Sequence, residues 1–379
     1  MTVSKKVKNK QRVSKFELLR IIAMFLIVLH HSIIHGVFAV GINNEINYPV
    51  NTIVSTILGM GGRIGVYLFV LVTGYFMIYS HITLAKIIKL WLPIFFWSIL
   101  LYSFVGIMIN NEFSIKNIIT SFFPIIFNQY WFMTVYVFMY CLIPFLNVLV
   151  NNINNEKKKI YFLFLGFVII FTQISNNLFG GMGAIGSNLL AFSFMYCIGA
   201  MIRNDNLLEN KLFVRKSNLY TIIIWALNIL IISTLILFGS ELNNTKLINL
   251  AQKFAFTPAT LLILFEAIGL FVWIGSKNIS YHSFVNKVAS VTFGIYLISD
   301  NSYVREWLWN TILHMNKMIN QNLIVIVVYT IVSSLLVFII CGCLEYLRKI
   351  IFGRIENILS NNLETVLLKK LDTISNIRI

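Results

Sequence analysis

Residues 17–38 read ELLRIIAMFLIVLHHSIIHGVF, an apolar run long enough to cross a lipid bilayer as a single helix. Arg20 and His31 are eleven positions apart in this run, and three helical turns take about 10.8 residues. The two side chains are therefore expected on one face of the helix, with Glu17 and His35 on or near the same stripe. Because a polar group inside a membrane costs free energy, this stripe indicates a functional site.

The composition extends the membrane interpretation to the whole chain. Of the 379 residues, 58% are hydrophobic and 12% are charged, whereas an ordinary soluble domain contains about 25% charged residues. Apolar runs of about 20 residues, enough to cross the hydrocarbon core, recur along the chain. We therefore predict an all-α, polytopic membrane helix bundle with about ten transmembrane helices, which cover residues 17–38, 54–79, 88–109, 128–150, 160–176, 186–203, 218–238, 255–275, 289–304 and 322–345.

The basic residues are sorted by loop, and this sorting predicts the topology. The net charge is +16, which in a soluble chain would suggest a nucleic-acid partner. With the N-terminus inside, however, the cytoplasmic segments carry 23 of the 30 Lys and Arg residues, and the outer loops carry five. Because cytoplasmic loops of membrane proteins are enriched in these residues, we predict that both termini are cytoplasmic and that no nucleic acid is bound.

Three parts are expected along the chain. Residues 1–15 form a basic cytoplasmic tail, which lacks the pattern of a cleavable signal peptide and is attracted to anionic lipid heads. Residues 16–346 form the transmembrane domain, and residues 347–379 form an amphipathic cytoplasmic tail along the inner membrane surface. The stretch SFFPIIFNQY around Pro124 is too short to cross the membrane, so it is either a re-entrant or interfacial piece or a short surface helix.

Disulfide and metal chemistry find no support in the sequence. The four cysteines lie in apolar contexts without a CxxC pair, and no His or Asp stands at a metal-ligand spacing from them. We predict neither a disulfide framework nor a metal site.

The position of a polar residue along its helix, and the helix face on which it lies, indicate which residues are the stronger functional candidates. If Arg20 stands at the cytoplasmic boundary, His31 lies about 16 Å deeper, near the bilayer midplane. His30 points about 80–100° away from His31 on a helix and ranks below it. Lys86 and Lys89, one turn apart, suit a phosphate-rich ligand, although a positive-inside anchor has the same spacing.

Five stretches of the chain, in this order, resemble the acyltransferase family 3 membrane proteins, which have about ten spans. They are LLRIIAMFLIVLHH, with Arg and His separated by ten residues; GRIGVYLFVLVTGY, whose glycines allow close helix contact; KIIKLWLP, with two cations three apart; YWFMTVYVFMYCLIP; and TFGIYLISDNSYVREWLW. Together they cover about residues 15 to 345. Such proteins transfer an acyl group, usually acetyl, from cytoplasmic acyl-CoA to a hydroxyl of a cell-surface glycan or its lipid-linked precursor.

The resemblance implies roles for particular residues. His31 matches the essential histidine of the family and Arg20 its cationic partner, and we group Glu17 with them as the third catalytic candidate on the stripe. Arg20, Lys86 and Lys89 match the acyl-CoA side. The family more often has arginines at the last two positions, and lysine keeps the charge without the bidentate phosphate geometry.

Two positions depart from the family pattern. Thr73 stands where serine is usual, which preserves the hydroxyl, and Ser299 stands where many relatives have a histidine, which leaves His31 without that second histidine. The residues expected on the acceptor side are Thr73, Tyr75, Trp131, Asp300, Asn301 and Arg305.

The function predicted from these features is a membrane O-acyltransferase that moves an acyl group, most often acetyl, from acyl-CoA to a glycan hydroxyl. Acyl-CoA is the co-substrate, and no bound cofactor is expected. The expected partners are membrane lipid, the glycan acceptor and glycan-assembly proteins, in a bacterial plasma membrane. A transporter or flippase for a polysaccharide or lipid-linked sugar is the alternative, because many spans with intramembrane charge suit it as well; a structural partner in glycan assembly is a third.

Overall fold

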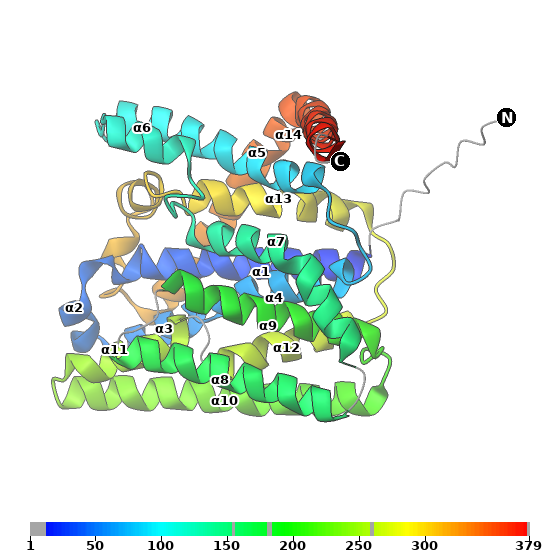
Figure 1. The fold of residues 1–379 in the computed structure, drawn as a ribbon. Helices are drawn as coiled ribbons and strands as arrows, with labels where there is room; N and C mark the ends of the chain where they lie inside the picture. The colour runs from blue at the N-terminus through cyan, green and yellow to red at the C-terminus, as the bar shows by residue number, and fades with distance from the viewer. Residues whose placement is uncertain (1–12, 154–155, 180–183, 258–260, 377–379) are drawn as a thin grey trace.

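The computed structural model describes residues 13–153, 156–179, 184–257 and 261–376. Within these ranges every regular element is a helix, which confirms the predicted all-α class. Most of the long helices lie side by side with roughly parallel axes, and α14 is the exception (Figure 1). Most of the predicted basic tail, residues 1–12, lies outside the described residues.

Fourteen α-helices, α1 to α14, follow one another along the described part of the chain, with short π-helical or 3-10 segments after α1, α5 and α13. The helices are α1 (Ser14–Ile34), α2 (Ile42–Asn47), α3 (Pro49–Gly59), α4 (Gly61–Met77), α5 (Leu84–Leu101), α6 (Ile115–Phe122), α7 (Trp131–Asn152), α8 (Glu156–Phe179), α9 (Ala184–Asn204), α10 (Lys211–Glu241), α11 (Thr245–Phe256), α12 (Leu261–Gly275), α13 (Ser283–Ser299) and α14 (Leu323–Asn376).

Seven helical segments of the described residues are long and apolar enough to cross a membrane, so the chain has the architecture of a multi-pass membrane protein. They are Ser14–Val40, Pro49–Met77, Leu84–Ile109, Trp131–Asn152, Lys211–Glu241, Thr245–Gly275 and Leu323–Leu367. The three other predicted spans coincide with α8, α9 and the shorter apolar helix α13. The count of ten and the orientation of the termini remain predictions.

Side chains at the helix starts account for several helix boundaries. Thr83, Ser114, Asn210 and Asn244 precede α5, α6, α10 and α11, and each accepts a hydrogen bond from a backbone N–H of the first turn. The first turn of a helix has N–H groups without a partner inside the helix, and these caps satisfy one of them.

The stretch SFFPIIFNQY is divided between a helix and a turn. α6 ends at Phe122, and residues 123–130 turn back to the start of α7. Inside this turn the carbonyl of Pro124 accepts the N–H of Gln129 at 2.9 Å. α6 lies at the edge of the bundle beside α5 (Figure 1), and its apolar residues Ile115 and Ile119 are exposed. Two residues of the stretch thus end a short helix at the edge of the bundle and the others form a turn, so the choice between the two interpretations stays a prediction.

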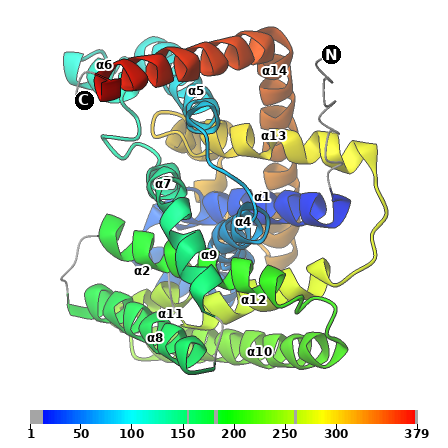
Figure 2. The same ribbon diagram turned by 45° about the vertical axis from the view of Figure 1, so that its right-hand side comes forward.

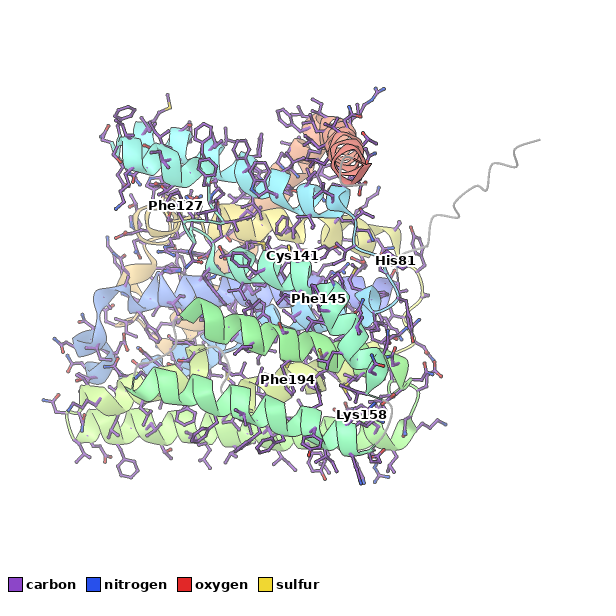
Figure 3. All side chains as sticks on the ribbon, viewed as in Figure 1. His81, Phe127, Cys141, Phe145, Lys158 and Phe194 are labelled. Carbon is purple, nitrogen blue, oxygen red and sulfur yellow. The ribbon has the colours of Figure 1, made fainter. Side chains whose placement is uncertain are left out.

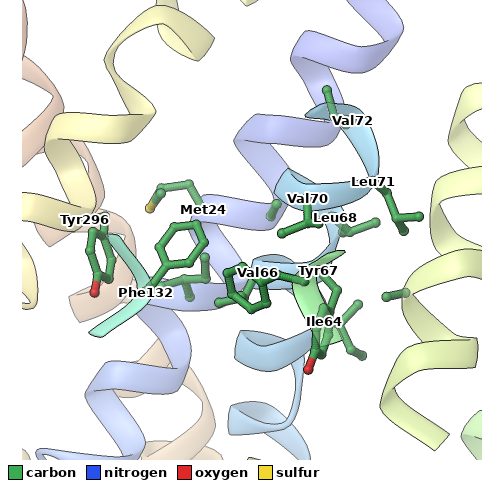
Figure 4. Packing of buried hydrophobic residues seen from close by; sticks show 14 of the residues in the cluster. Met24, Ile64, Val66, Tyr67, Leu68, Val70, Leu71, Val72, Phe132 and Tyr296 are labelled. Atoms are coloured by element: carbon green, nitrogen blue, oxygen red, sulfur yellow. The ribbon is translucent and has the colours of Figure 1, made fainter. Parts of the chain in front are cut away.

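Helix α1 lies at the centre and packs against α4, α12, α13 and α14. Gly65 of α4 faces it so closely that a Cβ there would lie 2.4 Å from the carbonyl oxygen of Ala23. Gly74 faces α9, where a Cβ would lie 2.0 Å from the carbonyl oxygen of Tyr196. The predicted close helix contact at these glycines is therefore confirmed. Buried side chains fill the space between α1, α4, α7 and α13 (Figure 4), among them Met24, Leu68, Phe132 and Tyr296.

The loops that carry most of the sorted basic residues meet at one end of the bundle, which we name the basic end (Figure 1). The hydroxyl of Tyr79, after α4, donates to Asn204 Oδ1 at the end of α9, at 2.8 Å. The backbone N–H of His282 donates to Ser14 Oγ at 2.8 Å, so α13 and α1 start side by side there. The charge sorting seen in the sequence thus corresponds to one physical end. Figure 3 labels two residues of this end, His81 and Lys158.

Helix α14 crosses the predicted boundary between residues 346 and 347 without interruption. Figure 2 shows that it turns, and its last part runs across α5. Where α14 meets α5, Arg348 binds Glu345 through two hydrogen bonds of 2.8 Å, and Trp97 Nε1 of α5 donates to Glu345 Oε2 at 2.7 Å. A buried ion pair needs such additional hydrogen bonds to offset its lost hydration, so this cluster ties α14 to α5.

Candidate active site

The predicted polar stripe lies on one unbroken helix, because α1 runs from Ser14 to Ile34. Near the basic end of α1, Arg20 Nη1 lies 2.8 Å from Glu17 Oε1. The Glu17 side chain is 6% exposed, whereas that of Arg20 is 30% exposed. Two of the three catalytic candidates are therefore an ion pair, of which the cation remains accessible to a ligand.

His31 lies toward the other end of α1, about 16 Å from Arg20 along the helix axis. Its Nε2 atom is 3.5 Å from Oδ1 of Asp300, and both side chains are buried. Its Nδ1 atom is buried and has no hydrogen-bond partner in the described part of the chain. Asp300 directly follows α13 as its C-terminal cap, so the packing of α13 on α1 creates this imidazole–carboxylate pair.

The Asp300 carboxylate has two further neighbours. His35 Nε2 also lies 3.5 Å from Oδ1, and its side chain is 23% exposed. Arg305 Nη1 lies 4.0 Å from the same oxygen and is 41% exposed. The site therefore consists of a buried histidine and carboxylate, with a second histidine and an arginine between them and the surface.

His30 has a different environment from His31, as the helical spacing predicts. Its Nδ1 atom lies 2.8 Å from the carbonyl oxygen of Gly59, which ends α3. A Cβ at Gly62 would lie 2.3 Å from the Cβ of His30, so the imidazole is packed tightly against α4. These contacts give His30 a structural position between α3 and α4.

Hydrogen bonds position the segment that carries Asp300. Asn301 Nδ2 donates to the hydroxyl of Tyr130 at 2.6 Å, and that hydroxyl donates to the carbonyl of Leu297 at 3.1 Å. Asn301, predicted on the acceptor side, is fully buried, and its hydrogen bond to Tyr130 holds the end of α13 against the start of α7. Ser299, where many relatives have a histidine, is also fully buried, in the residue before Asp300.

The other acceptor-side candidates lie in different places. Thr73, about one turn before the end of α4, donates to the carbonyl of Phe69 and shares a 2.8 Å hydrogen bond with the Tyr136 hydroxyl. The Tyr75 hydroxyl accepts from Arg203 Nη1 at 2.8 Å, at the basic end. The structure thus does not bring Thr73 and Tyr75 together with Asp300.

Trp131 contacts Arg63, a residue that was not among the candidates predicted from the sequence. The guanidinium of Arg63 lies over the Trp131 ring at 4.5 Å from its centroid, and Arg63 interacts electrostatically with both His31 and Asp300. The available signal was that Arg63 is the one charged residue in GGRIGVYLFVLVTGYFM. His35 was also unselected, although it falls on or near the stripe of α1.

Lys86 and Lys89 lie at the basic end, near the start of α5. Lys86 Nζ donates to Ser80 Oγ at 3.0 Å and to the carbonyl of His81, whereas Lys89 is exposed. Ser80 and His81 also line a cavity of about 480 Å³, whose other lining residues are Ile78, Tyr79, Ile82, Ile143, Pro144, Asn147 and Asn151. Lys86 therefore supports one wall of this cavity, whose lining mixes apolar and polar side chains.

An all-helical membrane bundle that buries an imidazole–carboxylate pair between distant segments has the features of a membrane-embedded enzyme. The family model described as an acyltransferase domain, that of acyltransferase family 3, matches residues 13–342. The chain belongs to this family, as its sequence motifs predict, and it is a membrane acyltransferase. No curated protein sequence and no solved structure matches the chain.

Proposed function

We propose that the protein is an O-acyltransferase of a bacterial plasma membrane, which moves an acyl group, most often acetyl, from cytoplasmic acyl-CoA to a hydroxyl of a cell-surface glycan or its lipid-linked precursor. The observation that carries this proposal is the His31–Asp300 contact of 3.5 Å. In this proposal His31 is a buried base on the same face of α1 as the accessible cation Arg20, and the two lie near opposite ends of the helix.

His31 is the general base of the proposed reaction. Asp300 orients the ring by accepting from the Nε2 side, which leaves the unpaired Nδ1 atom to take a proton. The acceptor oxygen bonds to the carbonyl carbon of the thioester while its proton passes to Nδ1. The carbon–sulfur bond then breaks, CoA leaves as a thiolate that takes a proton from water, and His31 gives its proton to water.

Acyl-CoA is proposed to bind at the basic end. Arg20, Lys86 and Lys89 supply positive charge there, and the cavity beside Lys86 offers polar groups of Ser80, Asn147 and Asn151 among apolar side chains. Cationic side chains bind phosphate groups through charge-assisted hydrogen bonds. Lys89, which is exposed, suits the phosphates better than Lys86, which already binds the loop before α5.

A stripe of α7 marks the proposed path of the acyl arm between this cavity and His31. The Tyr136 ring lies 6.3 Å from that of Tyr140 and 5.7 Å from that of Phe132. Phe132 in turn lies 5.4 Å from Tyr296, whose ring is 6.1 Å from His31. The residues of this stripe are spaced by one helical turn, and further along the same face Ile143 and Asn147 line the cavity.

The proposal is tested by incubating membranes that contain the protein with radiolabelled acetyl-CoA and cell-surface glycan. Label is expected in the glycan with the native protein and not with a His31→Gln variant expressed at the same level. Label that stays on the protein when no glycan is added identifies a transient acyl-enzyme instead of direct transfer. Movement of a lipid-linked sugar across the membrane without any acylation would instead support the flippase alternative and contradict the proposal.

A further inference from the structure

A hollow lined by two lysines lies on α11, at the end of the bundle that is opposite to the basic end. Its volume is about 650 Å³, and it is lined by Lys246, Asn249, Leu250, Gln252, Lys253, Phe256 and Thr257. Lys246 and Lys253 are seven positions apart and thus lie on one face of α11, two turns from each other. None of these described lining residues is acidic. Glu45 contacts Gln252 from beneath, but it is only 3% exposed.

Phe256 connects this hollow to the candidate active site. Its ring lies 5.2 Å from that of His30, and the His30 ring lies 5.8 Å from that of His31. The inner wall of the hollow is thus separated from His31 by a single imidazole.

Arg63 forms a second connection between the hollow and the site. Its Nε donates to the carbonyl of Phe256 at 2.6 Å, while its guanidinium lies over the Trp131 ring. No hydrogen bond of its two Nη groups is found within the described ranges. The Nε edge of the Arg63 guanidinium is therefore held by the Phe256 carbonyl and its flat face by the Trp131 ring. The N–H groups of the two Nη atoms are left to bind a ligand. The positive charge of Arg63 also interacts with Asp300.

We propose that this hollow binds the acceptor and that the acceptor is an anionic glycan, with carboxylate or phosphate groups on its sugar units. Lys246 and Lys253 contact the anionic groups, and Arg63 binds the unit whose hydroxyl approaches His31. This inference rests on the proposed acyl transfer. Two lysines line the hollow, and Arg63, which binds the Phe256 carbonyl behind its wall, adds a third cation. These charges attract an anionic ligand and offer no comparable attraction to a neutral glycan.

An anionic lipid headgroup has the same chemistry as an anionic sugar. The position of the hollow favours the glycan, because only Phe256 and His30 separate it from His31, the base that an acyl acceptor must reach. A lipid that only surrounds the protein has no need of this connection. The experiment therefore includes separate arms for the two ligands.

The test measures binding by the purified full-length protein without acyl-CoA, so it does not depend on activity. The probes are oligogalacturonate and a maltooligosaccharide of the same length. The native protein is expected to bind oligogalacturonate more tightly, and the double variant Lys246→Gln, Lys253→Gln is expected to lose about three- to ten-fold in that affinity at low salt, as exposed charge pairs are individually weak. Arg63→Gln is expected to have a similar effect. Lys116→Gln, an exposed lysine of α6, is the matched control and should change nothing.

Three results would overturn the inference. The first is equal binding of the anionic and the neutral oligosaccharide. The second is unchanged oligogalacturonate affinity in the double variant. The third is an effect of the variants only on binding of phosphatidylglycerol, measured in nanodiscs with and without that lipid. Failure of acyl transfer with intact, charge-dependent glycan binding would contradict the proposed function and leave the binding site standing.

Discussion

Nε2 of His31, in the first long helix, lies 3.5 Å from Oδ1 of Asp300, which ends α13. The pair joins the helix that carries the polar stripe to a segment near the other end of the sequence. A carboxylate beside an imidazole selects which ring nitrogen carries the proton and fixes the orientation of the ring. The following predictions depend on this pair and on the packing that produces it.

The two adjacent histidines should respond differently to substitution. His31→Gln is expected to lower acyl transfer about 10²- to 10⁴-fold, because a general base contributes about that much. His30→Gln should keep transfer within a few-fold and lower the thermal stability, because it disturbs the hydrogen bond to the Gly59 carbonyl. Transfer rates per mole of membrane-inserted protein check both. Equal loss in the two variants would contradict the separate roles.

Asp300→Asn should act on the rate and not on donor binding. The amide keeps the shape of the side chain but no longer favours the productive tautomer of His31, so the turnover rate is expected to fall about 10²-fold or more with an unchanged KM for acyl-CoA. Asp205→Asn is the control, since its ion pair with Lys159 is exposed at the basic end and contributes little. A normal turnover rate in Asp300→Asn would remove the carboxylate from the mechanism.

Substitution of a lysine of α5 should weaken the binding of the acyl donor. Lys89→Ala is expected to raise the KM for acyl-CoA several-fold and to leave the KM for the acceptor unchanged, because this exposed cation is the proposed contact of the CoA phosphates. Lys287→Ala, also an exposed lysine near this end, is the control. Steady-state kinetics with each substrate varied in turn distinguish the two outcomes. If neither KM changes, Lys89 serves only the topology of the chain.

Two helical glycines should have opposite effects on stability. At Gly74 a Cβ would lie 2.0 Å from the Tyr196 carbonyl oxygen, so Gly74→Ala must separate α4 from α9 and is expected to destabilise the fold by about 1–3 kcal/mol. At Gly353 nothing lies within 4 Å of a Cβ, so Gly353→Ala should stabilise α14 by up to about 1 kcal/mol through helix propensity. Thermal unfolding in detergent compares them, and a Gly74→Ala protein as stable as the native one would refute the close packing.

Glu45 lies between the first two candidate spans, and its titration should make the stability of the protein depend on pH. Burial raises the pKa of its carboxyl from 4.5 to about 7, and the hydrogen bond from Gln252 opposes this. The folded protein therefore holds a proton that the unfolded chain has lost. The contribution of Glu45 to the free energy of unfolding is highest below about pH 4.5, falls as the pH rises to about 7, and is level above that.

The variant Glu45→Gln tests this pH dependence, because glutamine cannot titrate. Thermal unfolding is measured at several pH values between about 5 and 8. The unfolding temperature should decline less steeply with rising pH in the variant than in the native protein. Parallel curves for the two proteins would show that Glu45 does not titrate in this range.

Much of the site could be predicted from the sequence because it lies on single helices. The spacing of Glu17, Arg20 and His31 depends only on helical periodicity, so α1 preserves it. The same periodicity separates His30 from His31. By contrast, the partner of His31 depends on which helix packs against α1, and Asp300 was one of six acceptor-side candidates without a distinguishing pattern. Tyr75 was placed among them because of its motif, but it lies at the basic end with Arg203.

The sequence by itself determined the membrane-spanning helices, the sorting of charge to one end and the polar stripe of α1, because hydrophobicity, charge and helical periodicity are local properties. Only the tertiary structure decided that Asp300 and His35 meet at His31, that Arg63 lies on Trp131, and that α14 turns across α5. These contacts join residues far apart in the chain, and the packing of the helices against one another decides which of them meet.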